Sequence, residues 1–250
     1  MALAKSRWHS LFWLALFFLL LLWPTYRLVE GYYRENLMRK NAQTLELFSA
    51  SLLGTLQRYE VLPYIIGQLP NVQNALLNPQ DPASTQATNL LLEKLQQQTG
   101  ADVIYLMEPN GLAIAASNWN EQQSFVGNNF SFRPYFREAL AGGLGEFFGL
   151  GNISLRRGYY FASPVHANGE IIGVIVVKVD LSFTENLWGN TPEQLMVTDH
   201  NGVVILTSEP DWYFRATRPL TEAELASILE HQPYTSTNPE QLNLNHQQWI

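Results

Sequence analysis

The 250-residue sequence contains no cysteine. This absence excludes disulfide scaffolds, thiolate zinc sites, iron–sulfur clusters and cysteine nucleophiles. Basic residues are scarce, since 15 Lys and Arg stand against 22 Asp and Glu for a net charge of −7. The excess is local, because the segment 181–250 carries two basic and nine acidic residues. An acidic chain without a basic stripe predicts no nucleic-acid partner. The neutral remainder leaves room for a small anionic ligand.

The sequence also lacks the motifs of common enzyme classes. Its five histidines are scattered without the H-E-x-x-H spacing of a metal site, so we expect them at surfaces or in turns. Neither a G-x-S-x-G elbow nor a phosphate-binding G-x-x-x-x-G-K loop is present. A periplasmic hydrolase needs a nucleophile–base pair, and none stands out. We therefore expect no catalytic residue, no metal ligand and no cofactor in this chain.

An unbroken apolar run, Leu11–Trp23, lies near the amino terminus. Its thirteen residues reach only about 20 Å as a helix, but the span from Trp8 to Tyr26 is long enough for a hydrocarbon core of ~30 Å. A cleaved signal peptide is the alternative, although residues 24–27 offer no small-residue cleavage site. The pattern favours an uncleaved transmembrane anchor within residues 1–30. Basic residues on both sides leave its orientation undecided.

The next part of the chain has helical periodicity. Apolar residues recur on one face of Glu35–Tyr59, which predicts a long amphipathic helix that acts as a stalk after the anchor. Such a stripe can pack on its own domain or on a second subunit, and we expect a homodimer through this stalk. A further helix is expected from Ser84 or Thr85 to Gln98, with Gly100 after its end.

Beyond Gly100 the pattern changes to strands and turns. A short helix is expected at Pro134–Ala141, with proline in its first turn. The expected strands are Val103–Met107, Leu112–Ser117, Gly158–Val165 and Ile171–Val179. Helices followed by strands predict an α+β fold.

An internal repeat links two parts of this strand region. Asn110–Ser117 aligns with Asn201–Ser208, 91 residues later, and each follows a short apolar strand and an acidic residue. Both segments predict a hairpin with an Asn-Gly turn. The recurrence favours two similar modules in tandem, the second of which has barely 60 residues and is expected to be incomplete.

Polar residues on the expected strands suggest a binding site. By the period of two, Lys178 and Asp180 share a face with Val174 and Val176, and a lysine directed into a pocket is a natural partner for a carboxylate. A strand end that emerges into solvent explains the same spacing equally well. Arg133 lies between Phe132 and Pro134, which suits either a desolvated guanidinium that binds a carboxylate or a structural stack on rings.

Three ordered blocks carry a family resemblance. They are Asn129–Phe136 with Ala139–Gly142, then Arg157–Phe161, then Gly173–Asp180. Together they resemble the periplasmic sensor of the bacterial four-carbon dicarboxylate sensor histidine kinases, the DctB family. The specific matches cover about a quarter of the chain, between Ser117 and Asp180.

The resemblance implies a double Cache, or tandem PAS-like, domain with antiparallel sheets that binds succinate, fumarate or malate. It divides the chain into an anchor (1–30), a helical stalk (31–98), a membrane-distal ligand module (99–190) and a truncated membrane-proximal module (191–250). Carried over by position, Arg133 and Lys178 would hold the carboxylates. The remaining ligand residues would be Tyr135, Tyr159, Ser163 and Asp180.

The same resemblance implies a two-component system that controls dicarboxylate uptake. Family members continue into an ATP- and magnesium-dependent kinase with a phospho-acceptor histidine, which acts on a response regulator. This sequence carries neither a phospho-acceptor box nor a nucleotide-binding glycine motif, so we expect the chain to bind ligand without being an enzyme. The expected location is the bacterial inner membrane, with the sensor in the periplasm. A chemoreceptor, a cyclase or a binding-only remnant are the alternative outputs.

Overall fold

The computed structural model describes residues 2–154, 156–182, 185, 188, 193–231, 234 and 239–242. The chain divides into two compact units, Met1–Ser51 and Leu52–Ile250. Helix α1 (Ala2–Glu60) accounts for the first unit and continues into the second. The predicted stalk helix is therefore confirmed as part of one continuous helix, which includes Pro24 in its interior.

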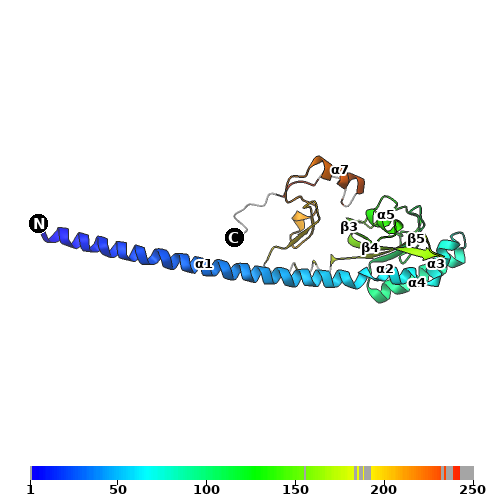
Figure 1. The fold of residues 1–250 in the computed structure, drawn as a ribbon, viewed down its shortest axis with the longest axis horizontal. Helices are drawn as coiled ribbons and strands as arrows, with labels where there is room; N and C mark the ends of the chain where they lie inside the picture. The colour runs from blue at the N-terminus through cyan, green and yellow to red at the C-terminus, as the bar shows by residue number, and fades with distance from the viewer. Residues whose placement is uncertain are drawn as a thin grey trace. The chain divides into compact units, whose positions relative to one another are not determined.

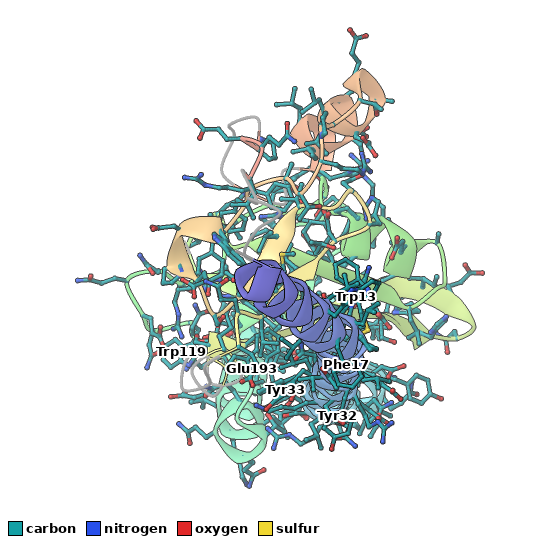
Figure 2. All side chains as sticks on the ribbon, turned by 90° about the vertical axis from the view of Figure 1, so that its left-hand side faces the viewer. Trp13, Phe17, Tyr32, Tyr33, Trp119 and Glu193 are labelled. Carbon is teal, nitrogen blue, oxygen red and sulfur yellow. The ribbon has the colours of Figure 1, made fainter. Side chains whose placement is uncertain are left out.

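Several aromatic side chains in the first part of α1 are exposed. Trp13, Phe17, Tyr32 and Tyr33 are all exposed, as Figure 2 shows. Many side chains of the apolar run at residues 11–23 lie outside the described residues. Within the part of the chain that the structure describes, no helix has both the length and the apolar content to cross a membrane.

Three shorter helices follow α1 in the second unit. They are α2 (Leu62–Gly67), α3 (Pro70–Leu77) and α4 (Pro82–Thr99). The predicted cap of α4 is wrong: Asp81, rather than Ser84 or Thr85, accepts hydrogen bonds from the Ala83 and Ser84 amides, and Pro82 opens the helix. Gly100 ends the helix in the left-handed conformation at φ 73°, as expected.

The central element is an antiparallel five-stranded sheet in the order β2-β1-β5-β4-β3. Figure 1 labels three of its strands, β3, β4 and β5. Its strands are β1 (Val103–Met107), β2 (Ala113–Ala116), β3 (Gly145–Leu150), β4 (Arg157–Ala167) and β5 (Glu170–Val179). Four of these confirm the predicted strands to within a few residues, but β3 was not predicted. Helix α5 (Pro134–Leu140) confirms the expected short helix.

The two faces of this sheet pack against different helices. On one face, Tyr105, Tyr160 and Val174 lie in a buried cluster with Tyr135 and Phe136 of α5. On the other face, α2 lies against β4 and β5, and a Cβ added at Gly67 would lie 3.5 Å from the side chains of Val165 and Ile175. Register places Tyr160 opposite Lys178, so both side chains point to the α5 face.

A second, two-stranded sheet contains β6 (Met196–Thr198) and β7 (Val204–Thr207). It precedes a 3₁₀ turn, η1 (Pro210–Trp212), and helix α7 (Glu222–His231). Both predicted Asn-Gly hairpins are confirmed, because β6–β7 repeats the turn of β1–β2. Gly111 and Gly202 have φ of 86° and 80°, and each amide donates to a carbonyl three residues earlier, at Glu108 and Asp199. The described residues do not decide the predicted module boundaries.

Candidate functional site

The α5 face of the sheet buries two cationic side chains, and Arg133 is the first. It is the N-cap residue of α5, where an extended backbone precedes the fixed φ of Pro134. The side chain is only 2% exposed. Its Nη2 donates to the Leu150 carbonyl at 2.8 Å and to the Asn152 side chain. The guanidinium carbon also lies 5.5 Å from the centre of the Phe147 ring, a geometry that favours a cation.

Lys178 is the second buried cation, and its side chain has no exposed surface. The Nζ atom donates to Asp102 Oδ2 at 2.5 Å and to Ser154 Oγ at 3.1 Å. The stem of the lysine crosses Gly158, where an added Cβ would lie 2.8 Å from Lys178 Cε. Strand β5 therefore delivers the lysine to the site, and the absence of a side chain at position 158 makes space for it.

Three buried tyrosines lie beside these cations. The hydroxyls of Tyr105 and Tyr135 are 2.6 Å apart, and the rings of Tyr135 and Tyr160 stack with centroids 5.1 Å apart. Burial raises the pKa of Tyr135 to about 12, although the nearby Arg133 charge opposes the shift. Burial likewise raises the pKa of Tyr105 and Tyr160. All three hydroxyls are protonated at neutral pH and can donate hydrogen bonds.

The turn after β3 contacts both cations. Asn152 accepts from Arg133, and two residues later Ser154 accepts from Lys178. Both cations therefore contact one short segment of the chain. The oxygens of this turn occupy donors of both cations, as the carboxylate oxygens of a ligand would.

Asp102 completes the arrangement, and no sequence pattern marks it as a site residue. It directly precedes β1, and its amide donates to the Lys178 carbonyl at 2.8 Å. Its carboxylate lies 3.4 Å from Arg156, and it is the main cause of a raised pKa at that guanidinium. Only the register of β1 against β5 reveals this pairing. Tyr105 and Tyr160 were missed for the same reason, because they lie in strands that read as apolar.

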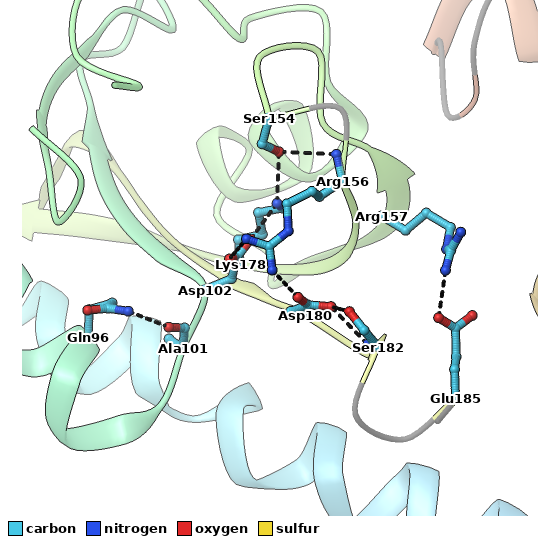
Figure 3. A network of polar contacts seen from close by, with 10 residues as sticks. All are labelled: Gln96, Ala101, Asp102, Ser154, Arg156, Arg157, Lys178, Asp180, Ser182 and Glu185. Carbon is cyan, nitrogen blue, oxygen red and sulfur yellow. Dashed lines mark hydrogen bonds and ion pairs between the residues drawn. The ribbon is translucent and has the colours of Figure 1, made fainter. Parts of the chain in front are cut away.

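Asp180 does not contact Lys178 in the structure. Its carboxylate accepts from Arg156 and from the Ser182 amide, the latter at 2.8 Å (Figure 3). Partial burial opposes ionisation, but hydrogen bonds from Ser182 and Arg156 outweigh it and lower the pKa of Asp180. Asp180 therefore pairs with Arg156, whereas Asp102 holds the ammonium of Lys178.

Two other predicted ligand residues lie on the opposite face. Register pairs Tyr159 with Val179 and Ser163 with Ile175, so both side chains point away from Arg133 and Lys178. The Tyr159 hydroxyl donates to Glu146 at 2.9 Å, and Ser163 is buried among the residues that face the helices. The structure thus brings Arg133, Tyr135 and Lys178 together but separates Tyr159 and Ser163 from them. The alternation of β4 places them on the other face of the sheet, and their contact with a ligand stays a prediction.

A second polar cluster connects β4 with the chain beyond the five-stranded sheet. Arg157 donates to Glu185 at 2.7 Å, and its guanidinium lies 3.7 Å from the centre of the Tyr213 ring. The Tyr213 hydroxyl donates to the same carboxylate at 2.8 Å. A cavity of about 210 Å³ adjoins this cluster. Arg157 directly follows the segment that contacts Lys178, so the cluster lies close to the site along the chain.

The antiparallel sheet and its covering helices have the architecture of known sensor domains. The same architecture occurs in chemoreceptors, such as the ligand-binding domain of Pseudomonas fluorescens CtaA, with a TM-score of 0.55 at 17% identity over 73% of this chain and 77% of that one. At this identity the likeness shows the fold alone. No family model matches the chain.

Closer relatives identify the family. The sensor domain of the Vibrio cholerae histidine kinase DctB superposes with a TM-score of 0.79 at 38% identity, over 83% of this chain and 81% of that domain. The C4-dicarboxylate transport sensor proteins DctB of Pseudomonas aeruginosa and Rhizobium meliloti are 52% and 41% identical over 98% and 72% of this chain. The chain spans 40% and 29% of the length of those two proteins. It belongs to the DctB family, as a sensor region of a histidine kinase.

Proposed function

We propose that this chain binds four-carbon dicarboxylates such as succinate, fumarate and malate on the α5 face of the five-stranded sheet. The observation that carries the proposal is the burial of Arg133 and Lys178 on one face, joined by a single turn. A planar guanidinium binds one carboxylate through two parallel hydrogen bonds, whereas an ammonium binds another as a compact charge. Tyr135 supplies a protonated hydroxyl between the elements that carry them.

The relatives support this ligand class. The matching proteins of Pseudomonas aeruginosa and Rhizobium meliloti are both named as sensors of C4-dicarboxylate transport. Each carboxylate of such a ligand can meet one of the two cations, so a ligand with two carboxylates should bind more tightly than one with a single carboxylate.

We further propose that the chain lies at the bacterial inner membrane, with residues 1–30 as an anchor and the sheet-bearing unit in the periplasm. The apolar run at 11–23 and the exposed aromatic residues of α1 support this location. In this arrangement ligand binding shifts the packing of paired stalk helices, and the shift controls a kinase that acts on a response regulator. The proposal includes a homodimer, and a full protein whose kinase output requires ATP and magnesium.

Calorimetry on the 250-residue chain in a non-ionic detergent tests the ligand class. We expect succinate to bind with micromolar to millimolar affinity, roughly −8 to −4 kcal/mol. Butyrate has the same length and one carboxylate fewer, so it should bind at least tenfold more weakly. Nonspecific attraction of anions is not expected from a chain of net charge −7. Equal binding of butyrate and succinate would refute the two-ended site.

A further inference from the structure

At one end of the site, Lys178 is buried and is already paired with the carboxylate of Asp102. The lysine stem is fully buried, and the chain closes over it at Gly158. An ammonium has three N–H donors, of which Asp102 and Ser154 accept two in the described part of the chain. One donor is left for a ligand, and a ligand group that takes it must approach the Asp102 carboxylate.

The charges around this ammonium are balanced before any ligand arrives. Lys178 and Arg156 are positive, and Asp102 and Asp180 are negative (Figure 3). Arg156 links the two carboxylates, at 3.4 Å from Asp102 and in direct contact with Asp180. A ligand carboxylate therefore enters a group with no net charge, where the attraction of Lys178 is offset by repulsion from Asp102.

An uncharged ligand group at the same place avoids this repulsion. A primary amide has the shape of a carboxylate, and its oxygen can accept the remaining N–H of the ammonium. Replacement of the ligand's second carboxylate by an amide should then weaken binding less than it would if no carboxylate neutralised Lys178. The carboxylate of Asp102 is the group that reduces the difference in affinity between the dicarboxylate and the amide ligand.

We propose that Asp102 is a specificity-determining residue, which lowers the preference of the Lys178 end for a charged carboxylate over an uncharged group of the same shape. The inference rests on the proposed function, because it concerns the ligand's second carboxylate. Arg156 acts in the opposite direction, since it offsets the charge of Asp102.

The test compares succinate with succinamate, in which one carboxylate is replaced by an amide, on the full chain. The measured quantity is the ratio of the succinamate to the succinate dissociation constant. Asp102→Asn keeps a hydrogen-bond acceptor for Lys178 but removes the charge, so this ratio should rise at least tenfold. A purely structural defect would weaken both ligands together and leave the ratio unchanged.

Two further variants complete the experiment. Arg156→Gln, at an exposed side chain, should lower the ratio about threefold, because it removes the positive charge beside Asp102. Glu121→Gln is the matched control, since it removes one negative charge near Arg156 without contact to Lys178 and should change the ratio less than twofold. If Asp102→Asn fails to fold, the Arg156→Gln result decides.

Each outcome separates this inference from the proposed function. A folded Asp102→Asn variant whose ratio is unchanged or lower overturns the role of Asp102, while the dicarboxylate proposal stands on the wild-type affinity for succinate. An unchanged ratio in Arg156→Gln overturns it as well. Absence of succinate binding to the wild-type chain defeats the proposed function, and the inference with it.

Discussion

The two faces of the five-stranded sheet are built from alternate residues of the same strands, yet they differ in chemistry. The face toward α2 is apolar, with Ile104, Ile175 and Val177 fully buried. The face toward α5 buries Lys178 equally, and Arg133, the N-cap residue of α5, is buried as well. One face therefore stabilises the fold by excluding water, and the other holds charges that need partners.

The difference shows why buried charges are tolerated on only one face. A buried ion costs several kcal/mol unless a partner and hydrogen bonds compensate it. Asp102 and Ser154 provide that compensation for Lys178, and the turn after β3 provides it for Arg133. On the helix face Ser163 is the small polar exception, and its hydroxyl lies 3.5 Å from the Pro164 carbonyl. We therefore expect mutations on the face toward α5 to change affinity, and mutations on the face toward α2, called here the helix face, to change stability.

The largest expected effect comes from removal of either cation. Arg133→Ala and Lys178→Met should each weaken succinate binding by about 2–5 kcal/mol, because a ligand carboxylate loses its charged partner. Arg133→Lys keeps the charge but not the planar pair of donors, so it should also bind more weakly. Titration calorimetry measures the three affinities, and melting curves verify that the variants fold.

Ser163→Ala is the control for this result. Its side chain lies on the helix face, so the succinate affinity should change less than twofold. A large loss of affinity in this variant, with no loss in Arg133→Ala, would reverse the assignment of the two faces.

Gly158→Ala should have the next largest effect on affinity. The new Cβ would lie 2.8 Å from Lys178 Cε and 3.1 Å from its Cγ, so the buried lysine must move. We expect succinate affinity to fall about tenfold, or 1.4 kcal/mol. Gly54→Ala, where an added Cβ meets no atom within 4 Å, should leave the affinity unchanged. Equal affinities for the two variants would show that the position of Lys178 is unimportant.

On the helix face, Ile175→Val should lower the free energy of unfolding by about 1 kcal/mol, because one buried methylene is lost. Succinate affinity should remain within twofold of the wild type. Denaturant unfolding and calorimetry on the same preparation measure the two quantities. A variant with normal stability and reduced affinity would contradict the separation of roles.

The smallest effect is expected at the surface ion pair of Arg218 and Glu224, in contrast to the buried pair of Lys178 and Asp102. Arg218 lowers the pKa of Glu224 to about 2, and hydrogen bonds from Thr221 assist. The folded pKa lies below the unfolded value of 4.5, so the stabilisation is complete above pH 4.5 and is lost as the pH falls toward 2. Glu224→Gln should lower the melting temperature slightly at pH 7 and not at pH 2. A difference that persists at pH 2 would point to packing instead of charge.

The sequence predicted only part of this fold, since strand β3 and helices α2, α3 and α7 were not predicted. Alternating and apolar runs located β1, β2, β4 and β5, because these strands are bounded by turn residues. Strand β3 was missed because Gly145 and Gly149 weaken its strand pattern. At Gly145 a side chain would collide with the Tyr135 carbonyl, so the glycine serves close packing against α5 and not a loop.

The candidate site was less predictable than the fold. Arg133 and Lys178 were found from composition and resemblance, and their burial agrees with that selection. Tyr159 and Ser163 lie on the face opposite to the cations. The sequence could not show this, because only the register of β4 against β5 decides which residues of the two strands share a face. Asp102 was missed because its partner lies 76 residues away in the chain. Pairings of this kind follow from topology and leave no local pattern.

The turn after β3 has a kinetic consequence. Asn152 and Ser154 bond to Arg133 and Lys178, so a ligand that takes over the donors of these bonds requires this turn to move. Association that waits for such a movement is slower than diffusion allows, and its observed rate levels off as the ligand concentration rises. The response time of the sensor then depends on how often the turn opens, while the bound fraction depends on the cations.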